Sequence, residues 1–451
     1  MFRRVLIANR GEIALRVIRA CKDLGIETVV VYSEADRGNS YLKLADHTVC
    51  IGPGPAKESY LDIPRIISAA EITNVDAIHP GYGFLSENSE FAEICESCNI
   101  RFIGPPSAST RLAGDKVMAR EMAKKSKIPT IPGSEGPVED EKAALEVAKA
   151  VGYPVMLKAA GGGGGRGMRI VHNDVSLVQS FLKAQAEVAA AFKNPALYVE
   201  KFIPNARHIE VQILADKHGN IIHLGERDCT VQRRFQKLIE EAPSPAITPS
   251  IRKDLGNAAI AFAKAVRYST VGTVEFLVDD RGRFYFIEMN SRIQVEHPVT
   301  EMVTGIDVVK EQIKMAADER LTISQRDVTW NGFAIECRIN AEDPMNGFRP
   351  CPGRITRLQF PGGPGVRVDS HAFTGYEVPP FYDSLIAKVI VHRRTHDEAV
   401  SAARSAIKEL VVEGIKTTIP LHLMILSHPL YITGQIHTSF VDSAFGRGTT
   451  T

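Results

Sequence analysis

Strand-like and helix-like segments alternate over the first 114 residues, and this alternation limits the possible folds more than any other feature. Residues 5–8 form a short apolar run, residues 12–24 carry apolar side chains at helical spacing, and residues 28–32 are rich in β-branched residues. A strand, a helix and a second strand in this order predict parallel strands joined by a crossover helix. We therefore expect an α/β protein with a Rossmann-like N-terminal domain.

The turn after the first strand lacks the glycine pattern of a dinucleotide site. Residues 9–12 read Asn-Arg-Gly-Glu, whereas the dinucleotide fingerprint requires Gly-x-Gly-x-x-Gly at this place. The Rossmann-like domain is therefore expected to bind no dinucleotide.

Length, charge and cysteine content narrow the class of protein. The 451 residues are enough for two to four domains. With 54 basic and 53 acidic residues, the net charge of +1 gives no overall field that would attract nucleic acid. No apolar run approaches the roughly 18 residues of a membrane span, and the start of the chain does not resemble a signal peptide. The seven scattered cysteines suit a reducing compartment. We expect a cytoplasmic protein with no nucleic-acid or membrane partner.

A glycine-rich run follows a strand-like segment in the second part of the chain. Residues 161–167 contain Gly-x-Gly-x-x-Gly, directly after the strand-like residues 154–158. The residues that come next, 168–171, are also strand-like, whereas a dinucleotide site requires a helix there. A hairpin whose backbone N–H groups close over phosphates fits better. A flexible turn without a ligand is the alternative.

Two strand-like runs carry a pair of acids. Glu275 lies in the first run, and Glu288 and Asn290 lie in the second. A two-residue turn at 280–281 would place Glu275 opposite Phe286, with Glu288 as its diagonal neighbour on the same face. Two carboxylates and an amide oxygen are the hard ligands that Mg²⁺ prefers, and ATP phosphates could complete its octahedron. The charged outer face of an ordinary hairpin is the alternative.

Polar residues alternate directly after this pair. In an extended backbone, Arg292, Gln294 and Glu296 share one face with Asn290. A cation, an amide and a base beside a metal could hold a small oxyanion, and a solvated edge with a salt bridge is the alternative. Other basic residues could meet a phosphate or lie in solvent: Lys116, Lys158 and the run 232–237.

Long motifs of the chain resemble biotin carboxylase, a family of the ATP-grasp superfamily. They are residues 8–13, 79–88, 158–165 and 288–297, and the match continues through 436–437. The resemblance implies an N-terminal Rossmann-like domain, an ATP-grasp core with a mobile glycine-rich lid, and a C-terminal α+β domain. The implied bounds are 1–114, 115–330 with the lid at about 131–203, and 331–446, followed by a tail at 447–451.

The resemblance also implies the roles of individual residues. ATP would be bound by Lys116, Lys158, Gly164, Gly165, Glu200, Lys201, Phe202, Ile203, His208, Glu275, Glu288 and His437. Mg²⁺ or Mn²⁺ would occupy two sites at Glu275 and Glu288, with Asn290 adjacent. Bicarbonate would be positioned by Lys237, Arg292, Gln294 and Val295. Glu296 would be the base, and Arg338 and Tyr82 would face biotin, so that the catalytic set is Arg292, Glu296, Lys237 and Arg338.

The implied activity is the ATP-dependent carboxylation of carrier-bound biotin by bicarbonate. The reaction passes through carboxyphosphate and gives carboxybiotin, ADP and phosphate, as in the first half-reaction of acetyl-CoA carboxylase in fatty acid synthesis. The sequence has no Met-Lys-Met biotinylation motif, so we expect a separate biotin carboxyl carrier protein, carboxyltransferase subunits and a homodimer. The alternatives are a subunit of a pyruvate or another acyl-CoA carboxylase, a different ATP-grasp ligase, and a nucleotide-binding module without catalysis.

One residue departs from the family pattern. The family carries histidine next to the nucleotide, where this chain has Phe235. Phenylalanine can neither donate a hydrogen bond nor carry charge. We therefore expect weaker ATP binding than in a Phe235→His variant.

Overall fold

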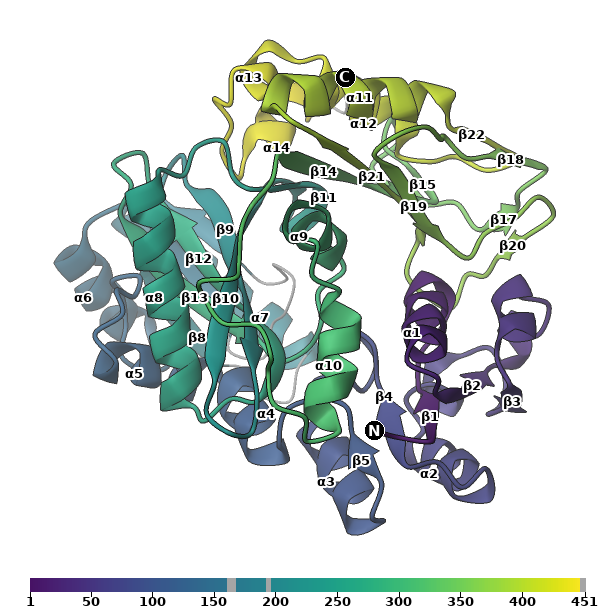
Figure 1. The fold of residues 1–451 in the computed structure, drawn as a ribbon. Helices are drawn as coiled ribbons and strands as arrows, with labels where there is room; N and C mark the ends of the chain where they lie inside the picture. Colours follow the sequence, from purple (N-terminus) through teal and green to yellow (C-terminus); the bar gives the residue numbers. More distant parts are fainter. Residues whose placement is uncertain (160–167, 192–195, 447–451) are drawn as a thin grey trace.

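The computed structural model describes residues 1–159, 168–191 and 196–446. The N-terminal residues form a sheet covered by helices on one side of the molecule, the middle of the chain forms the opposite side, and the C-terminal elements lie above both (Figure 1). Gly164 and Gly165, which we expected at the phosphates, lie outside the described residues. Within the described ranges, no helix is long and apolar enough to cross a membrane.

The N-terminal part has the expected parallel sheet. Its strands run in the order β3-β2-β1-β4-β5, and all four pairings are parallel. The strands are β1 (Arg4–Ile7), β2 (Glu27–Tyr32), β3 (His47–Cys50), β4 (Ala77–His79) and β5 (Arg101–Phe102). The helices are α1 (Gly11–Asp23), α2 (Ile63–Ile72) and α3 (Ser89–Ser97), with short 3-10 turns at Glu34–Asp36, Ser40–Leu44 and Ala56–Glu58.

The chain order reverses between β1 and β4, and the carboxyl ends of these two strands meet there. Asn9 follows β1, and its amide nitrogen lies 2.7 Å from each of the carbonyl oxygens of Pro80 and Tyr82, which follow β4. Open α/β sheets bind ligands at such a point. Asn9 thus fixes the loop that carries Tyr82, whose side chain lines a cavity.

A small antiparallel sheet flanks the glycine-rich run. Strand β6 (Val155–Ala159) pairs with β7 (Arg169–Val171) and with β8 (Leu197–Lys201), and the helices α6 (Glu141–Val151) and α7 (Asp174–Ala191) pack against this sheet. The segment after the run is therefore a strand, as expected, and the helix that a dinucleotide site requires is not found there.

An eight-stranded sheet connects the middle of the chain to its C-terminal part. The strand order is β13-β12-β9-β10-β11-β14-β21-β19. The strands are β9 (Arg207–Ala215), β10 (Ile221–Arg233), β11 (Gln236–Ala242), β12 (Thr270–Val278), β13 (Phe284–Asn290), β14 (Phe333–Asn340), β19 (Val366–Ser370) and β21 (Leu385–Arg393). Because β11 pairs with β14, one continuous sheet contains strands from before and from after residue 331, where we expected a domain boundary.

Helices and short strands complete the chain. The remaining helices of the first and middle parts are α4 (Ser107–Gly114), α5 (Lys116–Lys125), α8 (Pro249–Ala265), α9 (His297–Thr304) and α10 (Val308–Ala316). The C-terminal helices are α11 (His396–Glu409), α12 (Ile419–Leu426), α13 (Pro429–Ile432) and α14 (Phe440–Phe445). The short strands are β15 (Glu342–Asp343), β16 (Arg349–Pro350), β17 (Gly353–Arg354), β18 (Arg357–Gln359), β20 (Glu377–Val378) and β22 (Val411–Glu413). The sequence Thr395 to Glu398 forms the capping box of α11.

The register of the acidic hairpin differs from our expectation. Glu275 lies opposite Glu288, whereas we expected it opposite Phe286. The turn is one residue longer than assumed, since the Asp279 N–H donates to the Arg283 carbonyl at 2.9 Å, and the ladder shifts by one further residue directly after Glu275. A single one-residue shift would turn the acids to opposite faces, but two shifts restore the alternation. Both carboxylates therefore face the same side.

Candidate active site

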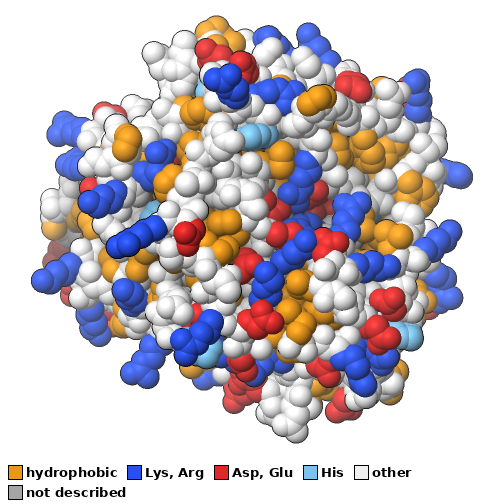
Figure 2. Space-filling model, in the orientation of Figure 1, with side chains coloured by type: hydrophobic (Ala, Val, Ile, Leu, Met, Phe, Trp, Pro, Cys, Tyr) orange, Lys and Arg blue, Asp and Glu red, His pale blue; other side chains and the backbone are white. Residues whose placement is uncertain are grey.

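A cavity of about 890 Å³ lies where the parts of the molecule meet. Most of the residues expected at the site line it: Tyr82, Lys116, Lys158, Glu200, Lys201, Phe202, Ile203, His208, Phe235, Lys237, Glu275, Glu288, Asn290, Arg292, Gln294, Val295 and Arg338. Glu296 and His437 are not among the lining residues, although their neighbours Val295 and Thr438 are. Figure 2 shows acidic and basic side chains gathered in a hollow near the middle of one face.

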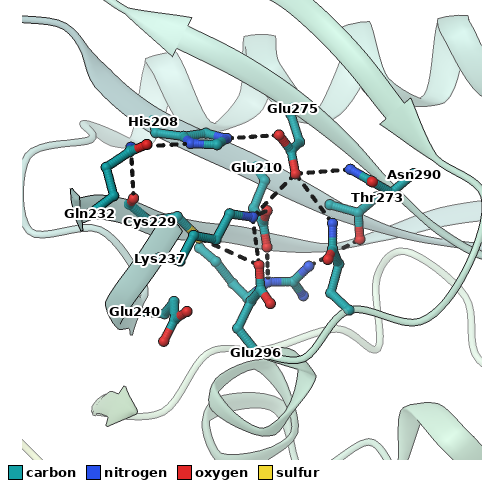
Figure 3. A network of polar contacts seen from close by, with 12 residues as sticks. His208, Glu210, Cys229, Gln232, Lys237, Glu240, Thr273, Glu275, Asn290 and Glu296 are labelled. Atoms are coloured by element: carbon teal, nitrogen blue, oxygen red, sulfur yellow. Dashed lines mark hydrogen bonds and ion pairs between the residues drawn. The ribbon is translucent and has the colours of Figure 1, made fainter. Parts of the chain in front are cut away.

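Lys237 lies at the centre of the charged residues. It extends from β11, and its ammonium lies 2.6 Å from Glu210, 3.1 Å from Glu275 and 2.6 Å from Glu296 (Figure 3). Burial opposes the charge, but Cys229 and these three carboxylates hold the pKa of Lys237 well above its usual range. Lys237 is therefore a permanent cation in a group of anions.

Glu296 is fully buried between two cations. Its carboxylate lies 2.6 Å from Lys237 and 2.8 Å from Arg338. Burial alone would raise the pKa of Glu296, but Lys237, Arg338 and Arg227 hold it well below the usual range. Glu296 therefore stays ionised and can accept a proton.

The backbone that leads to Glu296 is not extended, contrary to our expectation. Strand β13 ends at Asn290, and residues 291–296 form bends and a turn before α9. The side chains of Arg292 and Gln294 nevertheless line the cavity together, and Arg292 donates to Gln294 Oε1 at 2.8 Å and to Asn290 Oδ1 at 3.0 Å. Side-chain hydrogen bonds, rather than strand alternation, bring this group together.

Three glutamates that the sequence reasoning missed bind the cationic side chains of the site. Glu210 contacts Lys237, Glu240 lies 2.5 Å from Arg338, and Glu87 lies 3.0 Å from Arg292. Burial and the nearby charge of Glu296 raise the pKa of Glu240 to about 7, against the opposing effect of Arg338. Glu210 and Glu240 are fully buried within strands that also carry other polar residues, so the sequence offers no distinct signal for them.

The two acids of the hairpin differ in their environment. Glu275 accepts from Asn290 at 2.8 Å and contacts His208 at 2.9 Å. Although burial raises it, Lys237 and His208 hold the pKa of Glu275 well below its usual range. Burial, and then repulsion by Glu275, raise the pKa of Glu288. A divalent cation between the two carboxylates would relieve this repulsion, so these oxygen donors fit Mg²⁺.

Lysines of β6 and β8 also line the cavity. Lys158 forms an ion pair with Glu200, which also lies 3.4 Å from Arg120. Lys201 donates to the backbone carbonyls of Gly152 and Tyr153 at 2.9 Å each. These cations of β6 and β8 face the same cavity as the acidic hairpin, so one cavity offers both lysines for phosphates and carboxylates for a metal.

Phe235 lies at the tip of the hairpin between β10 and β11. Its φ of +66° is in the left-handed region, its side chain is 47% exposed, and it lines the cavity. The residue can thus reach a ligand, but it offers that ligand no hydrogen bond.

Models of three protein families match successive parts of the chain. "Biotin carboxylase, N-terminal domain" matches residues 1–110, "Carbamoyl-phosphate synthase L chain, ATP binding domain" matches residues 115–324, and "Biotin carboxylase C-terminal domain" matches residues 336–443. The fold and these matches define an ATP-dependent ligase with an ATP-grasp core.

Curated relatives and solved structures agree with these matches. The chain is 53% identical to biotin carboxylase 1 of Bacillus subtilis (98% of this chain, 99% of the relative) and 56% identical to biotin carboxylase of Nostoc sp. (98% and 99%). It is similar to a biotin carboxylase–βγ-ATP complex from Campylobacter jejuni (TM-score 0.95, 48% identity, 98% and 99% covered). It is also similar to the biotin carboxylase domain dimer of Hydrogenobacter thermophilus 2-oxoglutarate carboxylase with MgADP, ADP and bicarbonate (TM-score 0.94, 50% identity, 98% of each chain covered). The chain therefore belongs to the biotin carboxylase family, whose activity is the ATP-dependent carboxylation of biotin.

Proposed function

We propose that the part of the cavity around Arg292 binds bicarbonate and that Glu296 removes its proton. Arg292, Gln294, Val295 and Lys237 line this part and supply the cations and the amide that a small oxyanion needs. The observation that carries the proposal is the buried Glu296 carboxylate, which two cations keep ionised beside this anion site. The deprotonated bicarbonate oxygen then attacks the γ-phosphorus of ATP, the bond to the β,γ-bridging oxygen breaks, and carboxyphosphate and ADP form.

The ATP proposal places the nucleotide along the same cavity. Lys116, Lys158 and His208 bind its phosphates, together with Gly164 and Gly165. Residues 200–203, Phe235 and His437 border its adenine and ribose. The Campylobacter jejuni relative was solved as a βγ-ATP complex, which supports this placement.

The metal proposal rests on the acidic hairpin. Glu275 and Glu288, with Asn290 beside them, would hold Mg²⁺ or Mn²⁺ at two sites. The bound cations would neutralise charge on the phosphoryl group during its transfer. The MgADP in the Hydrogenobacter thermophilus domain supports the magnesium assignment.

The biotin proposal uses the wall formed by Tyr82 and Arg338. Carboxyphosphate decomposes to CO₂ and phosphate, and the phosphate takes the N1 proton of biotin. Arg338 stabilises the enolate-like ureido oxygen, and N1 then bonds to the carbon of CO₂ to give carboxybiotin. Arg338 suits this role because burial does not discharge it: Glu240 and Glu296 hold its pKa above the usual range.

We further propose that the biotin is borne by a biotin carboxyl carrier protein and that the chain acts as a homodimer with carboxyltransferase subunits in acetyl-CoA carboxylase. The family matches support a division near 1–114, 115–330 and 331–446. The dimeric 2-oxoglutarate carboxylase domain supports the homodimer. A second candidate acceptor is pyruvate, because the chain is 51% identical to the biotin carboxylase subunit of a pyruvate carboxylase.

The proposed activity is tested by ADP release with ATP, Mg²⁺, bicarbonate and free biotin. We expect ADP release to require bicarbonate, and Glu296→Gln to abolish it while ATP binding persists. ADP release that is unchanged without bicarbonate would contradict the proposal. Incubation with purified carriers and with acetyl-CoA or pyruvate transferases then distinguishes the acceptors.

A further inference from the structure

A buried lysine, Lys388, lies behind the wall of the cavity. It extends from β21 opposite Arg338 of β14, and its side chain is fully buried. Its ammonium lies 2.8 Å from the Val295 carbonyl oxygen, 3.1 Å from Glu12 Oε1 and 3.9 Å from Asp369 Oδ2. An ammonium has three protons to donate. The Val295 carbonyl accepts a hydrogen bond from this ammonium and Glu12 forms its shorter ion pair, whereas Asp369 lies beyond hydrogen-bond distance, so two neighbours fix the geometry of Lys388.

Glu12 connects this lysine to Tyr82. It lies in the motif 8–13, which none of the proposed roles uses, and only 4% of it is exposed. The Tyr82 hydroxyl donates to Glu12 Oε1, the same oxygen that contacts Lys388. The orientation of the Tyr82 hydroxyl therefore depends on where Glu12 and Lys388 lie.

On its other side, Lys388 fixes the backbone that leads to Glu296. The Val295 carbonyl, which accepts from Lys388, belongs to the same rigid peptide plane as the Glu296 N–H. The orientation of this plane determines the direction in which the Glu296 side chain leaves the backbone. That direction matters because the Glu296 carboxylate contacts both Lys237 and Arg338. The Lys388 ammonium therefore contacts both the backbone next to Glu296 and Glu12, the hydrogen-bond partner of Tyr82.

We propose that Lys388 and Glu12 are positioning residues that hold the Glu296 carboxylate and the Tyr82 hydroxyl in a fixed relation. Lys388 does not line the cavity, so it acts through these two neighbours. The inference rests on the proposed function, in which Glu296 serves bicarbonate and Tyr82 faces biotin. It adds the element that aligns the two substrates.

The test compares two assays: ADP release with bicarbonate alone, and biotin-dependent ADP release with the KM for free biotin. Tyr82→Phe, which removes the hydrogen bond to Glu12, should raise the biotin KM about tenfold. Glu12→Gln keeps a neutral acceptor for the Tyr82 hydroxyl and weakens this charge-assisted hydrogen bond, so it should raise the biotin KM by a smaller factor. Both variants should leave the bicarbonate assay unchanged. The double variant should show the tenfold rise of Tyr82→Phe alone, because both changes act on the same interaction. Lys388→Met should raise the biotin KM and also lower kcat in the bicarbonate assay by about tenfold.

A purely structural role would lower the active fraction equally in both assays and would not separate KM from kcat. Because Lys388→Met leaves Glu12 buried beside no cation, the charge-neutral variant Glu12→Gln/Lys388→Met is measured beside it and should show both effects. The matched control is Lys217→Met, which removes a half-exposed lysine paired with Asp318 and should change neither assay.

Two results are distinguishable failures. If the unsubstituted chain shows no bicarbonate- and biotin-dependent turnover, the proposed function is wrong, and this inference fails with it. If the unsubstituted chain turns over, but the effects of Glu12→Gln and Tyr82→Phe on the biotin KM multiply, or the charge-neutral variant behaves as the unsubstituted chain, the inference alone is overturned.

Discussion

Substitution of Lys237 by methionine tests the electrostatics of the site. Lys237 is 12% exposed and contacts Glu210, Glu275 and Glu296. The acceptor atoms of Glu210 lie within 4.8 Å of those of Glu275 and of Glu296. At an effective dielectric constant of about 20, each such pair of like charges repels by about 3.5 kcal/mol. Arg227, 2.5 Å from Glu210, and Arg338, 2.8 Å from Glu296, offset part of this repulsion, but without Lys237 three carboxylates remain beside these two cations. At least one carboxyl should therefore take up a proton.

The expected result for Lys237→Met has a thermodynamic and a kinetic part. Removing one partner of a buried ion pair costs about 3–5 kcal/mol, which for a chain of 451 residues corresponds to a melting temperature lower by about 3–5 °C at pH 8. The folded-state pKa of a carboxyl then lies above its unfolded value, so the folded variant binds the extra proton and regains stability as the pH falls from 8 to 6. ADP release should fall at least about a hundredfold, since a cation at the reacting anion is lost.

The measurement is thermal unfolding of the wild type and of Lys237→Met at pH 6 and pH 8, beside ADP release at both values. Lys217→Met, which breaks a half-exposed ion pair with Asp318, is the matched control and should cost no more than about 1 kcal/mol. The reasoning is refuted if Lys237→Met melts with the wild type, or if its deficit is as large at pH 6 as at pH 8.

Three further predictions concern single side chains. Phe235→His should lower the KM for ATP about tenfold, because the new side chain can donate a hydrogen bond to the nucleotide, whereas Phe235→Leu should not; equal KM values for the His variant and the wild type would contradict this. Glu288→Gln should raise the Mg²⁺ concentration for half-maximal ADP release at least tenfold, because an anionic ligand is lost, and an unchanged Mg²⁺ titration would exclude Glu288 as a ligand. Burial lowers the pKa of His422 to about 4, so the folded ring stays neutral while the unfolded ring gains a proton below about pH 6.5. Between pH 7 and pH 5, the free energy of unfolding of the wild type should therefore fall by about 2 kcal/mol more than that of His422→Gln. Thermal unfolding at both pH values measures this difference, and the exposed His172→Gln is the control.

The parts of the fold with a strong local pattern were predictable. The parallel N-terminal sheet followed from alternating strand and helix periods, and the strand after the glycine run followed from residues 168–171. The pairing of β11 with β14 was not predictable, because nothing in either segment identifies its partner among the other strands. Composition and periodicity do not encode which distant strands pair, so the continuation of the sheet past residue 331 could not be predicted from them.

Most of the residues expected at the site line one cavity, but part of the expected geometry was wrong. The acids Glu275 and Glu288 lie on one face as expected, although their pairing was wrong, because neither the turn length nor the irregularity after Glu275 leaves a distinct sequence signal. Glu210 and Glu240 were missed because a buried glutamate and an exposed one look alike in a single sequence. Only the tertiary structure shows that they hold Lys237 and Arg338 in place.

The most direct test of the central claim is the chemical fate of bicarbonate. The chain is incubated with ATP, Mg²⁺, free biotin and ¹³C-bicarbonate, and the biotin product is analysed by mass spectrometry at alkaline pH. We predict ¹³C-carboxybiotin that forms only when ATP and bicarbonate are both present and that is absent with Glu296→Gln. ATP cleavage by the wild-type chain without any labelled biotin product would contradict the account.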